Sequence, residues 1–129
     1  MKILGIGVDL VEVARLEQSI SRQGERFLRR VFTANEVAYC SAMKSPGPNY
    51  AARFAAKEAV AKAFGTGLGA QLSFQDIEVR RKASGEPYVV LHGEGAKLAR
   101  RRGVRQILLS LSHTASYAVA QVVINGTEA

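Results

Sequence analysis

The first apolar run of the chain predicts a short buried strand followed by a helix. Residues 3–9 are β-branched or apolar apart from two glycines and a final aspartate, a composition typical of a buried strand. The strand is expected to place Asp9 at its C-terminal edge. From Val11 to about residue 21 apolar residues recur at helical spacing, which predicts a helix that Gly24 ends or bends.

Two further helices are predicted in the middle of the chain. One spans about 33–43, where Thr33 as N-cap and Glu36 three residues later have the spacing of a capping box. The proline- and glycine-rich segment 45–49 is predicted to be a loop. Segment 50–64 is rich in alanine, and it carries the strongest helix signal of the sequence.

The C-terminal half predicts paired strands around one short helix. Two apolar runs are joined by a short turn-forming segment, a basic helical stretch follows, and two longer apolar runs end the chain. The expected elements are strands 74–80 and 88–91, helix 94–102, and strands 106–112 and 117–124. Helices and strands come in blocks, so the predicted fold class is α+β, a mainly antiparallel sheet packed against the long helix.

Length and composition favour one compact domain over residues 1–129. Apolar residues make up 47% of the chain and charged residues 22%, which excludes a disordered or fibrous protein. Cys40 is the single cysteine, so no internal disulfide can form. No apolar stretch is long enough for a membrane span, and the N-terminal run is too short for a signal peptide. We therefore expect a cytoplasmic protein that does not associate with membranes.

The formal net charge of +7 indicates a partner or ligand that is an anion. Nucleic acid, an acidic protein, a phosphorylated small molecule and an anionic membrane all satisfy this condition. Five arginines would form a basic stripe if the first helix continued past Gly24, although such a run is as often a solvated face. These are Arg15, Arg22, Arg26, Arg29 and Arg30.

Glu58 and Lys62 lie one turn apart on the alanine-rich helix, and two interpretations are open. They could form an exposed ion pair of small energetic value, or they could aim a carboxylate and a cation at one phosphate-bearing ligand. Magnesium is commonly held by one or two carboxylates together with water and substrate phosphates. Asp9 could be the second carboxylate, or it could cap the helix that begins near Val11.

Glycines after the long helix and a turn histidine give weaker signals. The run 65–69 follows a helix, whereas a standard phosphate-binding loop leads into one, so a helix stop with a loop is the simpler interpretation. His113 could contact a phosphate or move a proton, but a lone turn histidine more often does neither. No side chain shows a convincing base partner for a covalent intermediate, which favours transfer onto an external nucleophile.

Three sequence strings together resemble one enzyme family. They are Gly-Ile-Gly-Val-Asp at 5–9, Arg-Phe-Ala-Ala-Lys-Glu-Ala at 53–59 and Leu-Ser-His-Thr at 111–114. In this order and spacing they are similar to holo-acyl-carrier-protein synthase, the small bacterial class of 4'-phosphopantetheinyl transferases. The resemblance runs from about residue 3 to residue 124.

The resemblance implies a reaction and a metal site. The 4'-phosphopantetheine arm of coenzyme A would be transferred to a serine of apo acyl carrier protein, in support of fatty acid biosynthesis, and 3',5'-adenosine bisphosphate would be released. Asp9 and Glu58 would bind Mg²⁺ beside the pyrophosphate, and Lys62 would contact the phosphate. Glu58 and a metal-bound water both remain candidates for the base.

The resemblance also implies ligand and partner contacts. Residues expected to contact coenzyme A are Arg53, Lys62, Gly65, Thr66, Gly67, His113 and Thr114. Arg15, Arg22 and Arg26 would dock the acidic carrier protein. Family members form homotrimers with active sites at subunit junctions. The alternative function, a basic nucleic-acid-binding module without catalysis, lacks a recognisable motif and leaves the strings around Asp9 and Glu58 unexplained.

Overall fold

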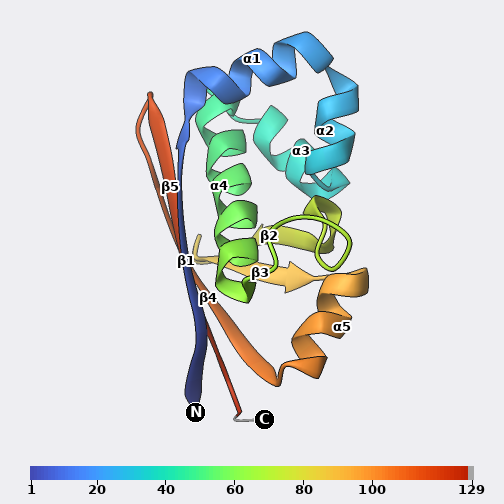
Figure 1. Cartoon of the computed structure of the whole chain (residues 1–129). Coiled ribbons are helices and arrows are strands. Elements are labelled where there is room, and N and C mark those ends of the chain that lie inside the picture. The colour runs from blue at the N-terminus through green and yellow to red at the C-terminus, as the bar shows by residue number, and fades with distance from the viewer. Residues whose placement is uncertain (128–129) are drawn as a thin grey trace.

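A three-stranded antiparallel sheet runs along one side of the molecule (Figure 1). The computed structural model describes residues 1–127. The strand order is β1-β5-β4, so the first and last strands are neighbours. These strands are β1 (Lys2–Glu12), β4 (Val104–His113) and β5 (Tyr117–Gly126). A separate antiparallel hairpin consists of β2 (Ile77–Arg81) and β3 (Pro87–Leu91).

The long helix α4 (Pro46–Phe64) lies against this sheet, with the shorter helices at its two ends (Figure 1). Those near its N-terminal end are α1 (Val13–Gln23), α2 (Glu25–Val31) and α3 (Ala34–Ser41), and α5 (Gly93–Arg101) lies toward the opposite end. The predicted α+β class with antiparallel pairing is confirmed. Within residues 1–127 no helix combines the length and apolarity that a membrane crossing needs.

Two glycines of β1 let α4 come into direct contact with the strand backbone. A Cβ atom at Gly5 would lie 1.9 Å from the carbonyl oxygen of Ala63, and one at Gly7 would lie 2.0 Å from that of Ala59. Real Cβ atoms do not tolerate such distances, so only glycine permits this packing. The alanines of α4 are buried on several sides of the helix, which keeps the approach close.

The structure corrects the prediction at the N-terminus. The strand does not end at Asp9 but continues to Glu12, and Asp9 pairs with Ala120 inside the sheet. Helix α1 consequently begins at Val13 rather than Val11. At Gly24 φ is +56°, which divides α1 from α2, so the conditional basic stripe on one continuous helix does not form.

Two other predicted element boundaries were also wrong, whereas the predicted signals at the start of α3 and at the end of α4 are confirmed. Segment 45–49 is not a loop, because α4 begins at Pro46 and a first-turn proline leaves no helical hydrogen bond unmade. Segment 74–80 starts with a 3-10 turn, Phe74–Asp76, before β2 begins. The capping box of Thr33 and Glu36 forms as predicted, and Gly65 ends α4 at φ +76°.

Candidate active site

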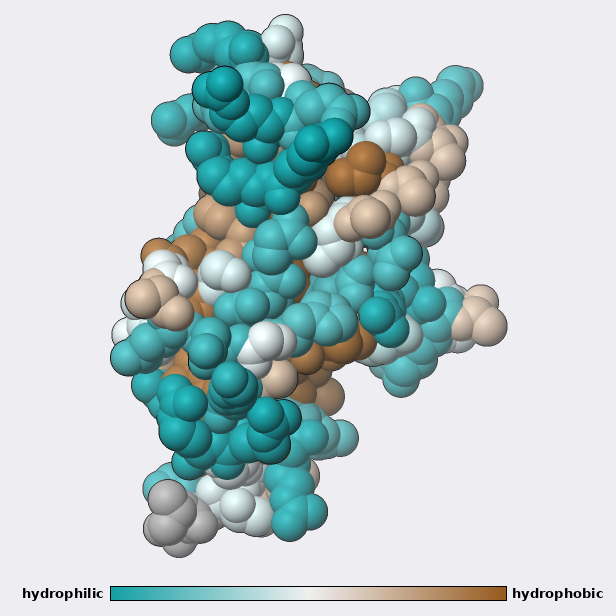
Figure 2. Space-filling view, turned by 90° about the vertical axis from the view of Figure 1, so that its right-hand side faces the viewer, coloured by the Kyte–Doolittle hydropathy of each residue, from teal (hydrophilic) through white to brown (hydrophobic). Residues whose placement is uncertain are grey.

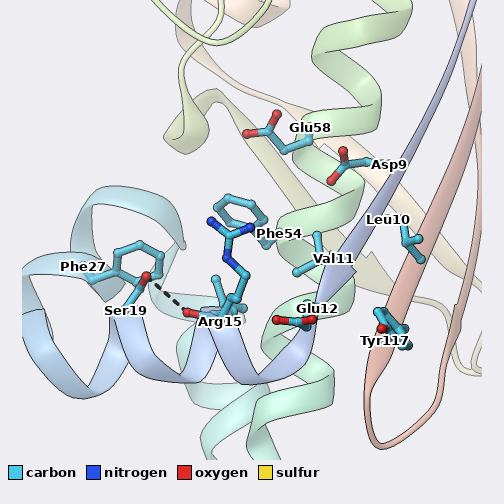
Figure 3. A pocket seen from close by; sticks show the side chains of 11 residues that line it. Asp9, Leu10, Val11, Glu12, Arg15, Ser19, Phe27, Phe54, Glu58 and Tyr117 are labelled. Carbon is cyan, nitrogen blue, oxygen red and sulfur yellow. Dashed lines mark hydrogen bonds between the residues drawn. The ribbon is translucent and has the colours of Figure 1, made fainter.

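An open cavity of about 500 Å³ lies between β1, α1 and α4 (Figure 3). Its wall combines three carboxylates, an arginine and aromatic rings. The lining residues are Asp9, Leu10, Val11, Glu12, Arg15, Leu16, Ser19, Phe27, Phe54, Glu58 and Tyr117. The carboxylates of Asp9 and Glu58 lie beside each other at one end of it (Figure 3).

Asp9 reaches this cavity from the side of β1 that faces α4. The side chain of Lys62 donates one hydrogen bond of 2.9 Å to Asp9 Oδ1 and another of 3.0 Å to the carbonyl oxygen of Val8. Glu58 and Lys62 do not form the exposed ion pair that their spacing allowed, since no such pair occurs within residues 1–127. Asp9 does not cap α1 either, because Glu12 occupies the N-cap position. Both simpler interpretations of these three residues were therefore wrong.

Glu58 has no hydrogen-bond or ion-pair partner among the residues that the structure describes. Burial raises the pKa of its carboxyl group, the nearby charge of Asp9 raises it further, and Lys62 partly offsets the rise. Two adjacent carboxylates with so few donors make an electrostatic environment that favours a bound cation. We call Asp9 and Glu58 the carboxylate pair.

The carboxylate pair fits a magnesium site that a substrate completes. Within residues 1–127 no group of three or more His, Cys, Asp or Glu side chains is placed to hold a metal ion. A protein cage for a tightly coordinated ion is therefore missing from this part of the chain. Magnesium, however, commonly uses one or two protein carboxylates and takes its other ligands from water and phosphate oxygens.

The opposite end of the cavity combines aromatic rings with Arg15 and Glu12. Phe54 lies one turn before Glu58 on α4, and its ring stacks on that of Phe74 with 5.6 Å between centroids. Arg15 projects from α1 into the space beside Phe54 (Figure 3). The sequence analysis did not identify Phe54 as a lining residue. Its i,i+4 spacing to Glu58 was the available signal, because residues at this spacing share one helix face.

Arg53 lies in a different cavity. Its side chain is 2% exposed, stacks over the Tyr39 ring at 4.3 Å and donates to the carbonyl oxygen of Asn49. This second cavity, of about 260 Å³, is also lined by Asn35, Val79, Arg80, Arg81 and Tyr88. The structure therefore does not bring Arg53 to the carboxylate pair of its own chain.

The remaining predicted ligand residues also lie outside the main cavity. The chain leaves the C-terminal end of α4 through Gly65, Thr66 and Gly67, and both glycines have left-handed backbone conformations. His113 pairs with Ala118 at the end of the β4–β5 hairpin, and the Thr114 hydroxyl accepts hydrogen bonds from backbone amides of that turn. From this hairpin, Tyr117 reaches the cavity instead.

Arg22 and Arg26 lie on the two sides of the break at Gly24. Both are exposed, as is Arg15 at the cavity. Figure 2 shows hydrophilic side chains gathered over the end of the molecule where α1 and α2 lie. The three arginines thus belong to one polar end of the molecule, although they do not form a continuous helical stripe.

Comparison with known proteins identifies the family. The model of the 4'-phosphopantetheinyl transferase superfamily matches residues 5–122. A holo-[acyl-carrier-protein] synthase of Koribacter versatilis is 48% identical over 95% of this chain and 98% of its own length. The crystal structure of the Neisseria meningitidis synthase has a TM-score of 0.90 at 33% identity, covering 96% of this chain and 99% of that one. The Helicobacter pylori synthase in complex with coenzyme A has a TM-score of 0.83 at 32% identity, covering 93% and 99%. The chain therefore belongs to the 4'-phosphopantetheinyl transferase superfamily, as its three sequence strings predict.

Proposed function

We propose that the protein transfers 4'-phosphopantetheine from coenzyme A to a serine hydroxyl of apo acyl carrier protein and releases 3',5'-adenosine bisphosphate. The observation that carries the proposal is the carboxylate pair, in which Glu58 has no hydrogen-bond or ion-pair partner among residues 1–127 and which lies within the range that the family model matches. The name of the Koribacter relative and the coenzyme A complex of the Helicobacter relative support it. The nucleic-acid-binding alternative gains no support from either.

The carboxylate pair would hold Mg²⁺ with the pyrophosphate of coenzyme A. The ion would neutralise charge that develops on the phosphates during transfer. Lys62 lies at the edge of the same site, and its side chain is 53% exposed, so it can reach a phosphate oxygen. The serine proton would pass to Glu58 or to a water molecule.

We also propose that the chain acts as a homotrimer with active sites at subunit junctions. The outward side of β1 exposes Ile6, Val8 and Leu10 at 56–69%. Ile6 and Leu108 both pair with Val123 and so lie in one row across the sheet. An exposed apolar face of this kind is typical of an interface. In such an assembly the neighbouring chain would supply Arg53 and His113 to coenzyme A.

The carrier protein would dock on the polar end formed by Arg15, Arg22 and Arg26. Opposite charges of this kind mainly speed association and lose their effect as salt increases. The reaction would support fatty acid biosynthesis in the cytoplasm, a compartment that suits the free thiol of the buried Cys40.

Mass spectrometry of apo acyl carrier protein tests the proposed function. Incubation with the protein, coenzyme A and Mg²⁺ should add one phosphopantetheine group to the carrier, and a chelator should prevent the addition. Light scattering after size exclusion measures the assembly, and Val8→Asp should convert a trimer to monomers. A carrier protein that keeps its mass would refute the activity, and a monomeric wild-type chain would refute the trimer.

A further inference from the structure

We infer that Lys57 is a positioning residue for the carboxylate pair, an inference that rests on the proposed function. Lys57 directly precedes Glu58, yet its side chain points to the other side of α4 and is fully buried. A buried ammonium group is costly unless it is fully hydrogen-bonded. Its surroundings therefore indicate what it holds in place.

All three donors of the Lys57 ammonium group are used. It lies 2.8 Å from Glu36 Oε1, 2.9 Å from the carbonyl oxygen of Phe74 and 2.6 Å from that of Ile77. These acceptors belong to α3, to the 3-10 turn Phe74–Asp76 and to the first residue of β2. One side chain thus fixes α4 against three other elements.

Glu36 makes this anchor rigid. Its Oε1 accepts a hydrogen bond of 2.8 Å from the Thr33 amide, and its Oε2 accepts one of 2.8 Å from the Val79 amide. The side chain is therefore held from the start of α3 and from β2 at the same time. Lys57 is attached to a fixed carboxylate, not to a mobile surface group.

The anchor lies in the middle of α4, where the neighbouring side chains are small; the other directional contacts of the helix, from Arg53 and Lys62, lie on either side of it. Small alanine side chains are buried on several faces of the helix, and Gly5 and Gly7 present bare backbone to it. Uniform small residues pack closely but do not distinguish one rotation or shift from another. The directional bonds of Lys57 do distinguish them, and consecutive helix residues differ by about 100°. Fixing Lys57 therefore fixes the direction in which Glu58 points.

The same anchor supports the aromatic side chains at the cavity. The carbonyl group that accepts from Lys57 belongs to Phe74, and the Phe74 ring stacks on Phe54. Phe54 lines the cavity together with Glu58. Loss of the anchor would therefore displace both Glu58 and Phe54, whereas Asp9 on β1 has no contact with it.

The test uses the double variant Lys57→Met/Glu36→Gln, because Lys57→Met alone would leave a buried unpaired carboxylate. Leu98→Ala is the matched control, since Leu98 is a buried side chain of α5 outside the site. Calorimetry measures Mg²⁺-dependent coenzyme A binding at a temperature where circular dichroism shows each protein folded. We expect the double variant to bind about ten- to a hundredfold more weakly. The control should lose stability and keep wild-type binding.

Wild-type binding in the folded double variant would overturn the inference and leave Lys57 a stabilising residue only. If the double variant does not fold, Lys57→Arg takes its place in the test. It retains the charge but not the three-point geometry, so it should show the same weakening of binding. A second readout does not depend on ligands. In a Cys40→Ala background, Asp9→Cys and Glu58→Cys should form a disulfide quickly, and more slowly once the anchor is removed. Unchanged disulfide formation would also contradict positioning, whereas absent coenzyme A binding by the wild type would refute the proposed function instead.

Discussion

Two clusters of this protein contain the same inventory, two carboxylates and a lysine, in opposite environments. The buried ionic cluster of Glu36, Glu78 and Lys57 lies among α3, α4 and β2, and each member is at most 2% exposed. The open cluster of Asp9, Glu58 and Lys62 lies one helix face away at the cavity. In the buried ionic cluster the protein itself supplies the partners of the charged groups. In the open cluster the carboxylates keep oxygen atoms available to a ligand.

The carboxyl pKa values record this difference. Burial alone would raise the pKa of Glu78, but hydrogen bonds from Thr33, His92, Arg80 and Asn35 lower it to about 2. Burial also raises the pKa of Glu58, and Asp9 raises it further without such donors to compensate. The acids of the two clusters therefore differ in the number of protein donors that reach their oxygens, not in their charge.

The largest expected effect concerns the open cluster. Asp9→Ala and Glu58→Ala should each reduce phosphopantetheine transfer by roughly a thousandfold, because each removes half of the carboxylate pair. Both variants should remain folded, since neither carboxylate supports the core. Transfer is measured by carrier mass and folding by circular dichroism. Normal turnover in either variant would show that the open cluster is not required for the reaction.

The next effect concerns the buried cluster. Glu78→Gln should lower the free energy of unfolding by about 2 kcal/mol at pH 7, because it removes a charge that four side chains stabilise. A lowered pKa stabilises the fold above the unfolded value of 4.5, and this contribution is lost as the pH falls toward 2. Urea unfolding at several pH values should therefore show a penalty that shrinks on acidification. A penalty independent of pH would indicate lost packing instead.

Glu58→Gln should have the opposite and smaller effect on stability. A carboxyl whose pKa is raised on folding contributes stability below its unfolded pKa and loses it as the pH rises through the folded value. The amide avoids this loss, so the variant should melt slightly above the wild type at pH 7 and equally at acidic pH. Thermal melts at both pH values measure it. A lower melting temperature at pH 7 would show that Glu58 is structural.

The smallest effect lies outside both clusters. Arg22→Glu should raise the KM for carrier protein a few-fold and leave coenzyme A affinity unchanged, because it reverses one charge on the polar end. Arg101→Glu, at an exposed position of α5, makes the same charge change at a distance and serves as the control. Steady-state kinetics at low and high salt compare them. Equal losses for the two variants would indicate net charge rather than a docking site.

The sequence predicted most elements and the members of the open cluster. Local signals were sufficient where structure is local, as in the capping box of Thr33 and Glu36 and in the glycine stop at Gly65. The prediction of a loop at 45–49 was wrong because turn residues such as proline are also compatible with the first turn of a helix.

The buried cluster could not be predicted from spacing. Glu36 and Lys57 are 21 positions apart, and their pairing depends on how α3 packs on α4. The i,i+4 pairing of Glu58 with Lys62 was equally unreliable, because a partner on β1 lies closer to Lys62. Sequence patterns describe one element at a time, whereas both clusters form between elements.

Strand β1 has a consequence for how this protein tolerates change. Along it, Ile6, Val8 and Leu10 alternate with Gly7 and with Asp9, so that apolar side chains face outward and the carboxylate faces α4. A single inserted residue before Gly7 would shift the strand register by one and exchange the two faces. Asp9 would then point to solvent, and side chains would meet the α4 backbone where only glycine fits. Point substitutions on the outward face leave that register intact, so the side of β1 that faces α4 depends on the length of the strand as well as on its two glycines and Asp9.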